Sequence, residues 1–237
     1  IIEMSEPIKP EAYRIETGGI VGQSFGLIAL GLFKDEDDVK NSPEQLFGAY
    51  GPGYIKYKDM NNDGKIDIDD YTAVGDGYLP RLNYAANIQL RYKGLDFSVL
   101  LQGASMSSVY LSNAAVRAFR SDGAISEFAL NRYTGPENWA TATYPILSTL
   151  GNDNNWRLST YWLRDATYLR IKNVELGYTL PEKISNKLHL SRIRFVCNAY
   201  NLFCFDYIKD FDPEASSSGV SGYPQIKLFS FGLNINF

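Results

Sequence analysis

The residues best suited to chemistry are the acidic and amide side chains of one short stretch. They lie in the sequence Asp59-Met60-Asn61-Asn62-Asp63-Gly64-Lys65-Ile66-Asp67-Ile68-Asp69-Asp70. Oxygen-bearing side chains fall at positions 1, 3, 5, 9 and 12, with glycine at position 6, which is the spacing of a twelve-residue calcium loop. Calcium takes about six to eight hard oxygen ligands, and alternate short side chains converge as the backbone wraps. The spacing therefore predicts a calcium site.

The predicted site has six ligands and a structural role. They are Asp59, Asn61, Asp63, the backbone carbonyl of Lys65, Asp67 and Asp70. Gly64 permits the positive-φ turn. Position 12 holds Asp70 where glutamate is usual, which shortens the reach for bidentate binding. The flanking segments lack the pattern of two amphipathic helices, so the loop is isolated. The alternative is an acidic surface turn without metal.

Five segments alternate apolar and polar residues with period two, which predicts β-strands. Such strands could position the loop. They are residues 82–92, 95–103, 168–180, 192–205 and 229–237. Lys93-Gly94 joins the first two as a β-hairpin. The alternation slips between Ile171 and Val174, which predicts a β-bulge near Asn173.

Two further segments are assigned from local signals. Residues 42–49 begin with Ser-Pro-Glu-Gln, a capping-box pattern with proline at the first helical position, so a short helix is predicted there. Residues 107–160 form a polar connection long enough to indicate a function. Its Trp139 and Trp156 are candidate substrate-binding residues, because an aromatic ring stacks on the apolar face of a sugar. Packing within the loop is the alternative for each tryptophan.

Composition excludes several classes of protein. With 45% hydrophobic and 14% aromatic residues, the chain is too apolar for disorder, yet it has no apolar run long enough for a transmembrane helix. The net charge of −4 and the lack of a basic cluster argue against nucleic acid as a partner. No nucleophile elbow, phosphate loop, zinc triad or positioned carboxylate pair indicates an enzyme.

The strand faces distinguish two architectures. Long strands with one apolar face, one polar face and aromatic residues near their ends are typical of an antiparallel transmembrane β-barrel. An ordinary soluble sheet with one wet face is the alternative, for example a calcium-stabilised β-sandwich that binds carbohydrate. Soluble strands average about 5–6 residues, so strands of nearly twice that length favour the barrel.

Three stretches also carry a family resemblance. They are Tyr57-Lys58-Asp59 through the acidic loop to Val74-Gly75-Asp76 and Tyr92-Lys93-Gly94-Leu95-Asp96, then Asp165-Ala166-Thr167-Tyr168-Leu169-Arg170-Ile171-Lys172-Asn173-Val174-Glu175-Leu176-Gly177-Tyr178, and last Asn198-Ala199-Tyr200-Asn201-Leu202-Phe203 with Phe211-Asp212-Pro213-Glu214 and Gly222-Tyr223-Pro224. In this order, the stretches resemble the C-terminal part of the SusC/RagA-type TonB-dependent transporters of Bacteroidota outer membranes.

The resemblance implies both a fold and a function. Members of this family form barrels of 22 strands with an N-terminal plug and long extracellular loops. They work with a SusD-like surface lipoprotein and import oligosaccharides or oligopeptides with energy that TonB delivers through the plug. The implied location is the outer membrane of a Gram-negative cell, in contact with membrane lipid and lipopolysaccharide. The implied function is nutrient uptake.

The resemblance also gives an expected domain organisation. Residues 1–237 would be the C-terminal portion of the barrel, with a calcium-type loop at 59–70 and an extracellular loop at 107–160. The plug and the N-terminal strands would lie outside this chain, and Ile1-Ile2-Glu3-Met4 does not read as a signal peptide. The final strand ends in phase on Phe237, which resembles the C-terminal signal that outer-membrane assembly machinery reads.

Overall fold

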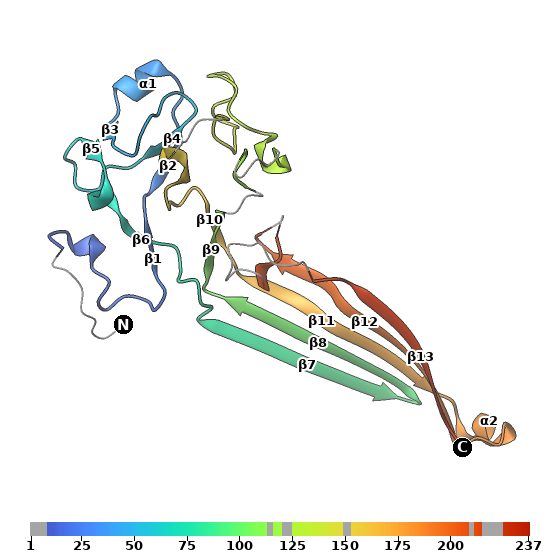
Figure 1. Ribbon diagram of the computed structural model, residues 1–237. Coiled ribbons are helices and arrows are strands. Elements are labelled where there is room, and N and C mark those ends of the chain that lie inside the picture. The colour runs from blue at the N-terminus through green and yellow to red at the C-terminus, as the bar shows by residue number, and fades with distance from the viewer. Residues whose placement is uncertain (1–8, 113–115, 120–124, 149–152, 209–210, 215–224) are drawn as a thin grey trace. The chain divides into compact units, whose positions relative to one another are not determined.

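The computed structural model describes residues 9–112, 116–119, 125–148, 153–208, 211–214 and 225–237 (Figure 1). The chain divides into two compact units. One contains residues 80–106, 166–214 and 222–237, and the other contains residues 1–79, 107–165 and 215–221.

The first unit is an antiparallel sheet of five long strands, with the order β13-β12-β11-β8-β7 (Figure 1). The strands are β7 (Leu82–Tyr92), β8 (Leu95–Ser105), β11 (Tyr168–Thr179), β12 (Arg192–Asp206) and β13 (Leu228–Asn236). All five predicted strands are confirmed, with ends within two residues. Within the described residues, β7 and β13 each have a hydrogen-bonded neighbour on one side only.

The turn between β7 and β8 follows from two residues with positive φ. Lys93 has φ of 47° and Gly94 has φ of 85°, which suits a tight hairpin whose twist matches its strands. The predicted bulge is also confirmed, because the register of β11 with both neighbours shifts between Ile171 and Asn173. The alternation of faces along β11 therefore changes phase at this point.

One face of this sheet presents large apolar side chains that remain exposed. Phe231 is 82% exposed and Tyr92 is 70% exposed. Tyr84, on the same face, lies over Gly103 of the neighbouring strand, where a side chain would collide with its ring. Its hydroxyl donates to the carbonyl of Tyr168, 2.8 Å away, and so bridges β8. An apolar face without a protein cover is the pattern of a sheet in lipid.

The second unit is built from short elements. They are η1 (Ala12–Arg14), β1 (Ser24–Gly26), β2 (Ala29–Leu32), α1 (Glu36–Lys40), β3 (Glu44–Gln45), β4 (Ile55–Tyr57), β5 (Lys65–Ile66), η2 (Ile68–Asp70), β6 (Thr72–Val74), β9 (Ser108–Tyr110), η4 (Glu127–Ala129), η5 (Asn154–Trp156) and β10 (Leu163–Asp165). The strand pairs are β1 with β6, β2 with β4, β3 with β5, and β9 with β10. Its core includes Phe33, Tyr57, Tyr144 and Trp162.

The helix predicted at residues 42–49 is wrong. Residues Glu44–Gln45 form the strand β3, which pairs in parallel with β5. The side chain of Gln45 is buried and bonds to the backbone of β4, so tertiary contacts override the local capping signal. The helix lies earlier, at α1, where the Asp35 carboxylate caps the N–H of Asp38 at 2.9 Å.

The helices of the described residues are short. The remaining one, α2 (Glu182–Lys187), lies between β11 and β12. Over the part of the chain that is described, no helix is long and apolar enough to cross a membrane.

Candidate functional site

The first half of the acidic loop is organised by Asp59. Its two carboxylate oxygens accept the backbone N–H groups of Asn62 at 2.6 Å and Gly64 at 2.9 Å. Both of these residues have positive φ, 60° for Asn62 and 84° for Gly64, so the chain curls around the carboxylate. The turn expected at Gly64 is therefore confirmed.

The second half of the loop is organised by Asp70, which is 1% exposed. Its oxygens accept the N–H of Met60 at 2.7 Å and of Asp67 at 2.8 Å, so the two ends of the loop are tied together. Burial raises the pKa of Asp70. The two N–H donors oppose this shift, and the nearby Asp59 and Asp67 add to it. A positive charge in the loop would stabilise this carboxylate.

The oxygen atoms of these side chains suit a hard cation by chemical type, but the side chains do not lie close enough together to form a metal site. In the part of the chain that is described, no three Asp, Glu, His or Cys side chains form a group that could hold a metal. Asn61 and Asp63 instead bond to each other at 3.1 Å. Each carboxylate oxygen has a second lone pair after accepting one N–H. Calcium binding by these residues and the Lys65 carbonyl stays a prediction.

The two candidate tryptophans lie in different surroundings. Trp156 stacks on Trp162, with ring centroids 4.7 Å apart, and the guanidinium of Arg117 lies 4.9 Å from its centroid. These contacts support packing for Trp156. Trp139 is 38% exposed and its indole N–H donates to the Leu32 carbonyl, so its ring keeps more open surface. A role in substrate binding stays a prediction for both.

A network of buried amides holds the second unit together, and the sequence did not indicate that its members meet. Gln45 and Asn154 bond to each other at 2.9 Å, and both donate to the carbonyl of Ile55. Asn155 accepts the N–H of Ile55 at 2.9 Å. The Tyr57 hydroxyl donates to the Asn154 carbonyl at 2.6 Å, and burial raises the pKa of Tyr57. Such a network fixes one arrangement because each buried partner needs the others.

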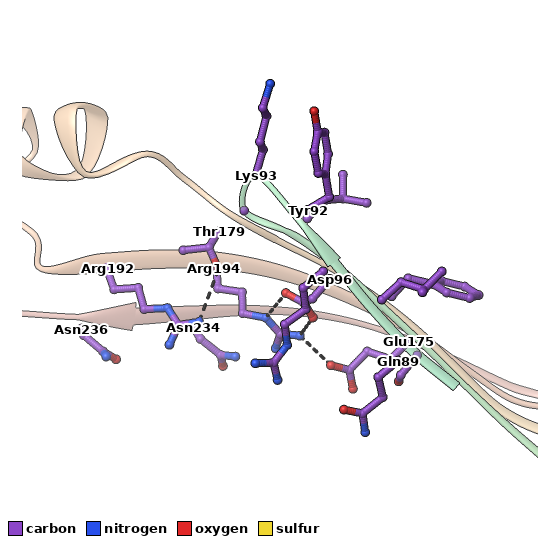
Figure 2. Close-up of a pocket in the computed structure, with 16 residues that line it drawn as sticks. Gln89, Tyr92, Lys93, Asp96, Glu175, Thr179, Arg192, Arg194, Asn234 and Asn236 are labelled. Atoms are coloured by element: carbon purple, nitrogen blue, oxygen red, sulfur yellow. Dashed lines mark hydrogen bonds and ion pairs between the residues drawn. The ribbon is translucent and has the colours of Figure 1, made fainter. Parts of the chain in front are cut away.

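The sheet carries a polar hollow of about 820 Å³ at the end where the β7–β8 turn lies (Figure 2). Arg194 of β12 forms ion pairs there with Asp96 of β8 and with Glu175 of β11, the latter at 2.6 Å. Figure 2 shows Arg192, Asn234 and Asn236 beside this group. The hollow therefore has charged and amide side chains along its wall.

Glycine makes room for the ion pair. A Cβ atom on Gly177 would lie 2.4 Å from both the Arg194 guanidinium and the Asp96 carboxylate. Because β11 separates β8 from β12, the pair has to cross this strand, and it does so where the strand has no side chain. The residue pair is 98 positions apart in sequence, which is why the sequence did not indicate it.

A second ionic cluster lies elsewhere on the same unit. Arg170, which is 4% exposed, pairs with Asp212 at 2.6 Å and with Glu214 at 2.9 Å. Lys172 pairs with Glu214 at 3.1 Å. The two cations come from β11, and both carboxylates come from the short segment 211–214 after β12.

The sequence of the chain is similar to those of known proteins over most of its length. A TonB-dependent receptor of Formosa agariphila, P26, is 30% identical over 92% of this chain. A second from that organism, P3, is 27% identical over 94%, and the TonB-dependent receptor SusC of Bacteroides thetaiotaomicron is 24% identical over 82%. This chain is related to the SusC-type TonB-dependent receptors. No protein-family model matches it.

Solved structures give the fold of this SusC-type segment. A chain of the RagAB peptide transporter superposes with a TM-score of 0.67 over 91% of the segment, at 20% identity. The same importer in its open-open state gives 0.64, at 21% identity. The five-stranded sheet therefore has the fold of an all-β barrel segment, as predicted, whereas the strand faces alone left an ordinary soluble sheet as the alternative.

The SusC-type segment spans only part of its relatives. It covers 23% of the length of the two Formosa receptors and 19% of SusC. These relatives are named as receptors and not as enzymes.

Proposed function

We propose that the chain is a wall segment of a TonB-dependent transporter in the outer membrane of a Gram-negative bacterium. The observation that carries the proposal is the exposed apolar face of the five-stranded sheet, which includes Phe231 and Tyr92. In water this face would cost about 25 cal/mol for each Å² left uncovered, whereas lipid tails remove that cost. The opposite, polar face would then line the transport path.

The outer edges of β7 and β13, which have no hydrogen-bonded neighbour among the described residues, support the same proposal. In lipid, an unpaired backbone N–H or C=O costs several kcal/mol, so spanning sheets close on themselves. The outer edges of β7 and β13 would pair with strands from the rest of the polypeptide. The relatives are about four times longer than this segment, which leaves enough chain to supply those strands and a plug.

The proposed cargo is an oligosaccharide or an oligopeptide. The similarity to SusC and to a chain of the RagAB peptide importer supports this range. By the same similarity, a SusD-like surface lipoprotein would cap the transporter, and TonB would deliver energy through the plug. Calcium bound at the loop 59–70 would have a structural role, and Trp139 would be the better placed of the two tryptophans to stack on cargo.

A soluble, calcium-stabilised sandwich that binds carbohydrate is less well supported. In a sandwich, the apolar face of one sheet packs on a second sheet about 10 Å away. Here the side chains of that face are exposed. No observation among the described residues favours this second function.

The test uses the full-length transporter expressed with its neighbouring lipoprotein. We expect it in the outer-membrane fraction, and we expect uptake of short peptides or oligosaccharides that stops when TonB is deleted. A matched strain that lacks the transporter gives the background. Recovery of the folded protein in the soluble fraction without detergent would contradict the proposal.

A further inference from the structure

The cluster around Arg170 joins a buried arginine of β11 to two carboxylates of the segment 211–214. Its guanidinium is almost completely buried, and it contacts Asp212 at 2.6 Å through one nitrogen and Glu214 at 2.9 Å through another. The Asp212 side chain is only 8% exposed. A buried guanidinium needs both charge and hydrogen-bond partners, because its desolvation is otherwise uncompensated.

The carboxylates fasten the segment 211–214 at more than one point. Asp212 also accepts the backbone N–H of Glu214 at 2.9 Å and that of Gln225 at 3.0 Å. Glu214 is bonded in addition to Lys172. The segment is therefore held both to β11 and to the residues that lead into β13.

The side of the sheet on which the segment lies follows from the register. Arg170 is paired with Gln102 of β8 and Cys204 of β12, and it alternates with the apolar Leu169 and Ile171. Arg170 thus belongs to the polar face. Because its partners are Asp212 and Glu214, residues 211–214 lie over that face and not over the apolar one.

We propose that Arg170, Lys172, Asp212 and Glu214 form an ionic latch that holds residues 211–214 over the transport path and limits the size of solute that passes. This inference rests on the proposed function, since the polar face is the path only in a barrel wall. The latch residues are positioning residues. They act through the segment that they hold, and their role does not depend on which solute is carried.

A native thiol reports on the latch without any transport measurement. Cys204 lies opposite Arg170, whereas Cys197 lies opposite Leu176 on the apolar face. In the full-length transporter, after subtraction of the labelling seen in a separate Cys204→Ser protein, a water-soluble maleimide should label Cys204 several-fold faster in the Asp212→Asn, Glu214→Gln variant than in the parent. These substitutions keep shape and remove charge. Unchanged labelling would overturn the latch.

Two matched variants separate the latch from a general loss of charge. Asp96→Asn removes an ion pair on the same face at the other cluster, and it should leave labelling at the parent rate. The exchange Arg170→Asp with Asp212→Arg should return labelling toward the parent rate. If labelling rises equally in Asp96→Asn, the assignment to residues 211–214 is wrong. If the exchanged variant fails to assemble, the neutral variant still decides.

Size limitation is measured as TonB-dependent uptake of neutral oligosaccharides of graded length by cells that express the full-length transporter with its neighbouring lipoprotein. The neutral latch variant should admit longer oligosaccharides than the parent and than Asp96→Asn. The same cut-off in all three would overturn size limitation even if labelling rises. Absence of TonB-dependent uptake by the parent in cells would count against the proposed function, whereas the labelling result stands apart from it.

Discussion

Arg194 of β12 and Asp96 of β8 meet above Gly177 of the strand between them. The Arg194 Nε atom lies 3.2 Å from an Asp96 oxygen, and the pair also contacts Glu175. Neighbouring strands lie about 4.8 Å apart, so two side chains that skip a strand have to reach across nearly 10 Å. The missing side chain at position 177 gives them a direct path. Three strands are thereby connected by one guanidinium.

This relationship predicts a coupling between positions 177 and 96. Gly177→Ala should destabilise the parent because the new Cβ displaces the ion pair. In an Asp96→Ala background, the same change should be neutral or stabilising, because alanine suits a strand better than glycine. We expect a coupling free energy of about 1 kcal/mol from unfolding in detergent by guanidinium chloride. Additive effects would refute the coupling.

The two faces of β13 predict opposite tolerance for charge. Leu233 belongs to the apolar face and is exposed, and its neighbour Asn234 lies beside Arg194 on the polar face. Leu233→Arg should lower the free energy of unfolding by about 1–4 kcal/mol, depending on its depth in lipid. Asn234→Arg is the matched control and should assemble normally. The folded fraction in outer membranes, read from heat-dependent gel mobility, measures both. Equal tolerance would argue against lipid contact.

Calcium should stabilise the fold if the acidic loop binds it. At 100 times its dissociation constant, a ligand adds about 2.7 kcal/mol to the free energy of unfolding. Chelation should therefore lower the melting temperature of the full-length protein, and added calcium should restore it. Asp63→Ala should abolish this response. Magnesium, which favours fewer protein ligands, is the control ion. An identical melting temperature with chelator and with calcium would refute the predicted calcium site.

The buried amides should be sensitive to single substitutions. Asn154→Ala removes one hydrogen-bond partner from Gln45 and one from the Ile55 carbonyl, although these two groups still bond to each other, so we expect a loss of about 1–3 kcal/mol in the free energy of unfolding. Asn41, which is exposed and bonds locally to Asp37, supplies the control, and Asn41→Ala should change stability by about 0.5 kcal/mol or less. Limited proteolysis of residues 107–165 measures the local effect. Equal protease resistance would show that the network is dispensable.

Substitution of the two tryptophans should have different effects, on stability at Trp156 and on cargo binding at Trp139. Trp156→Ala should lower stability by about 3–5 kcal/mol, because it opens the stack with Trp162. Trp139→Ala should weaken binding of cargo while stability changes less. Isothermal titration with the full-length protein and melting curves measure the two quantities. If Trp139→Ala leaves affinity unchanged, the substrate role at this position is wrong.

The strands could be predicted because their period-two pattern is local. The polarity of each residue of β7 indicates the face of the sheet on which it lies. The change of alternation near Asn173 is visible in the sequence in the same way. Pairing between distant positions leaves no such mark. The Arg194–Asp96 pair and the contact between Gln45 and Asn154 depend on strand order and loop path. The helix assigned to residues 42–49 failed for the same reason.

The candidate site was predicted only in part. The acidic spacing correctly indicated the turn at Gly64, since that depends on a few neighbouring residues. It could not indicate that Asn61 and Asp63 bond to each other. The latch was likewise hidden, because the stretch that holds Asp212 and Glu214 carries the family resemblance but gives no sign of their pairing with Arg170.

Because of the bulge at Asn173, the number of residues in β11 decides which of its side chains lie on the polar face. Before it, Arg170 shares the polar face with Cys204; after it, Glu175 shares that face with Ser98 and Asn198. Even-numbered positions lie on the polar face on one side of the bulge and odd-numbered positions on the other. Deletion of one residue there would therefore turn one end of the strand over and place either Arg170 or Glu175 on the apolar face. Genes of this family should accept point substitutions along β11 far more readily than single-codon insertions or deletions.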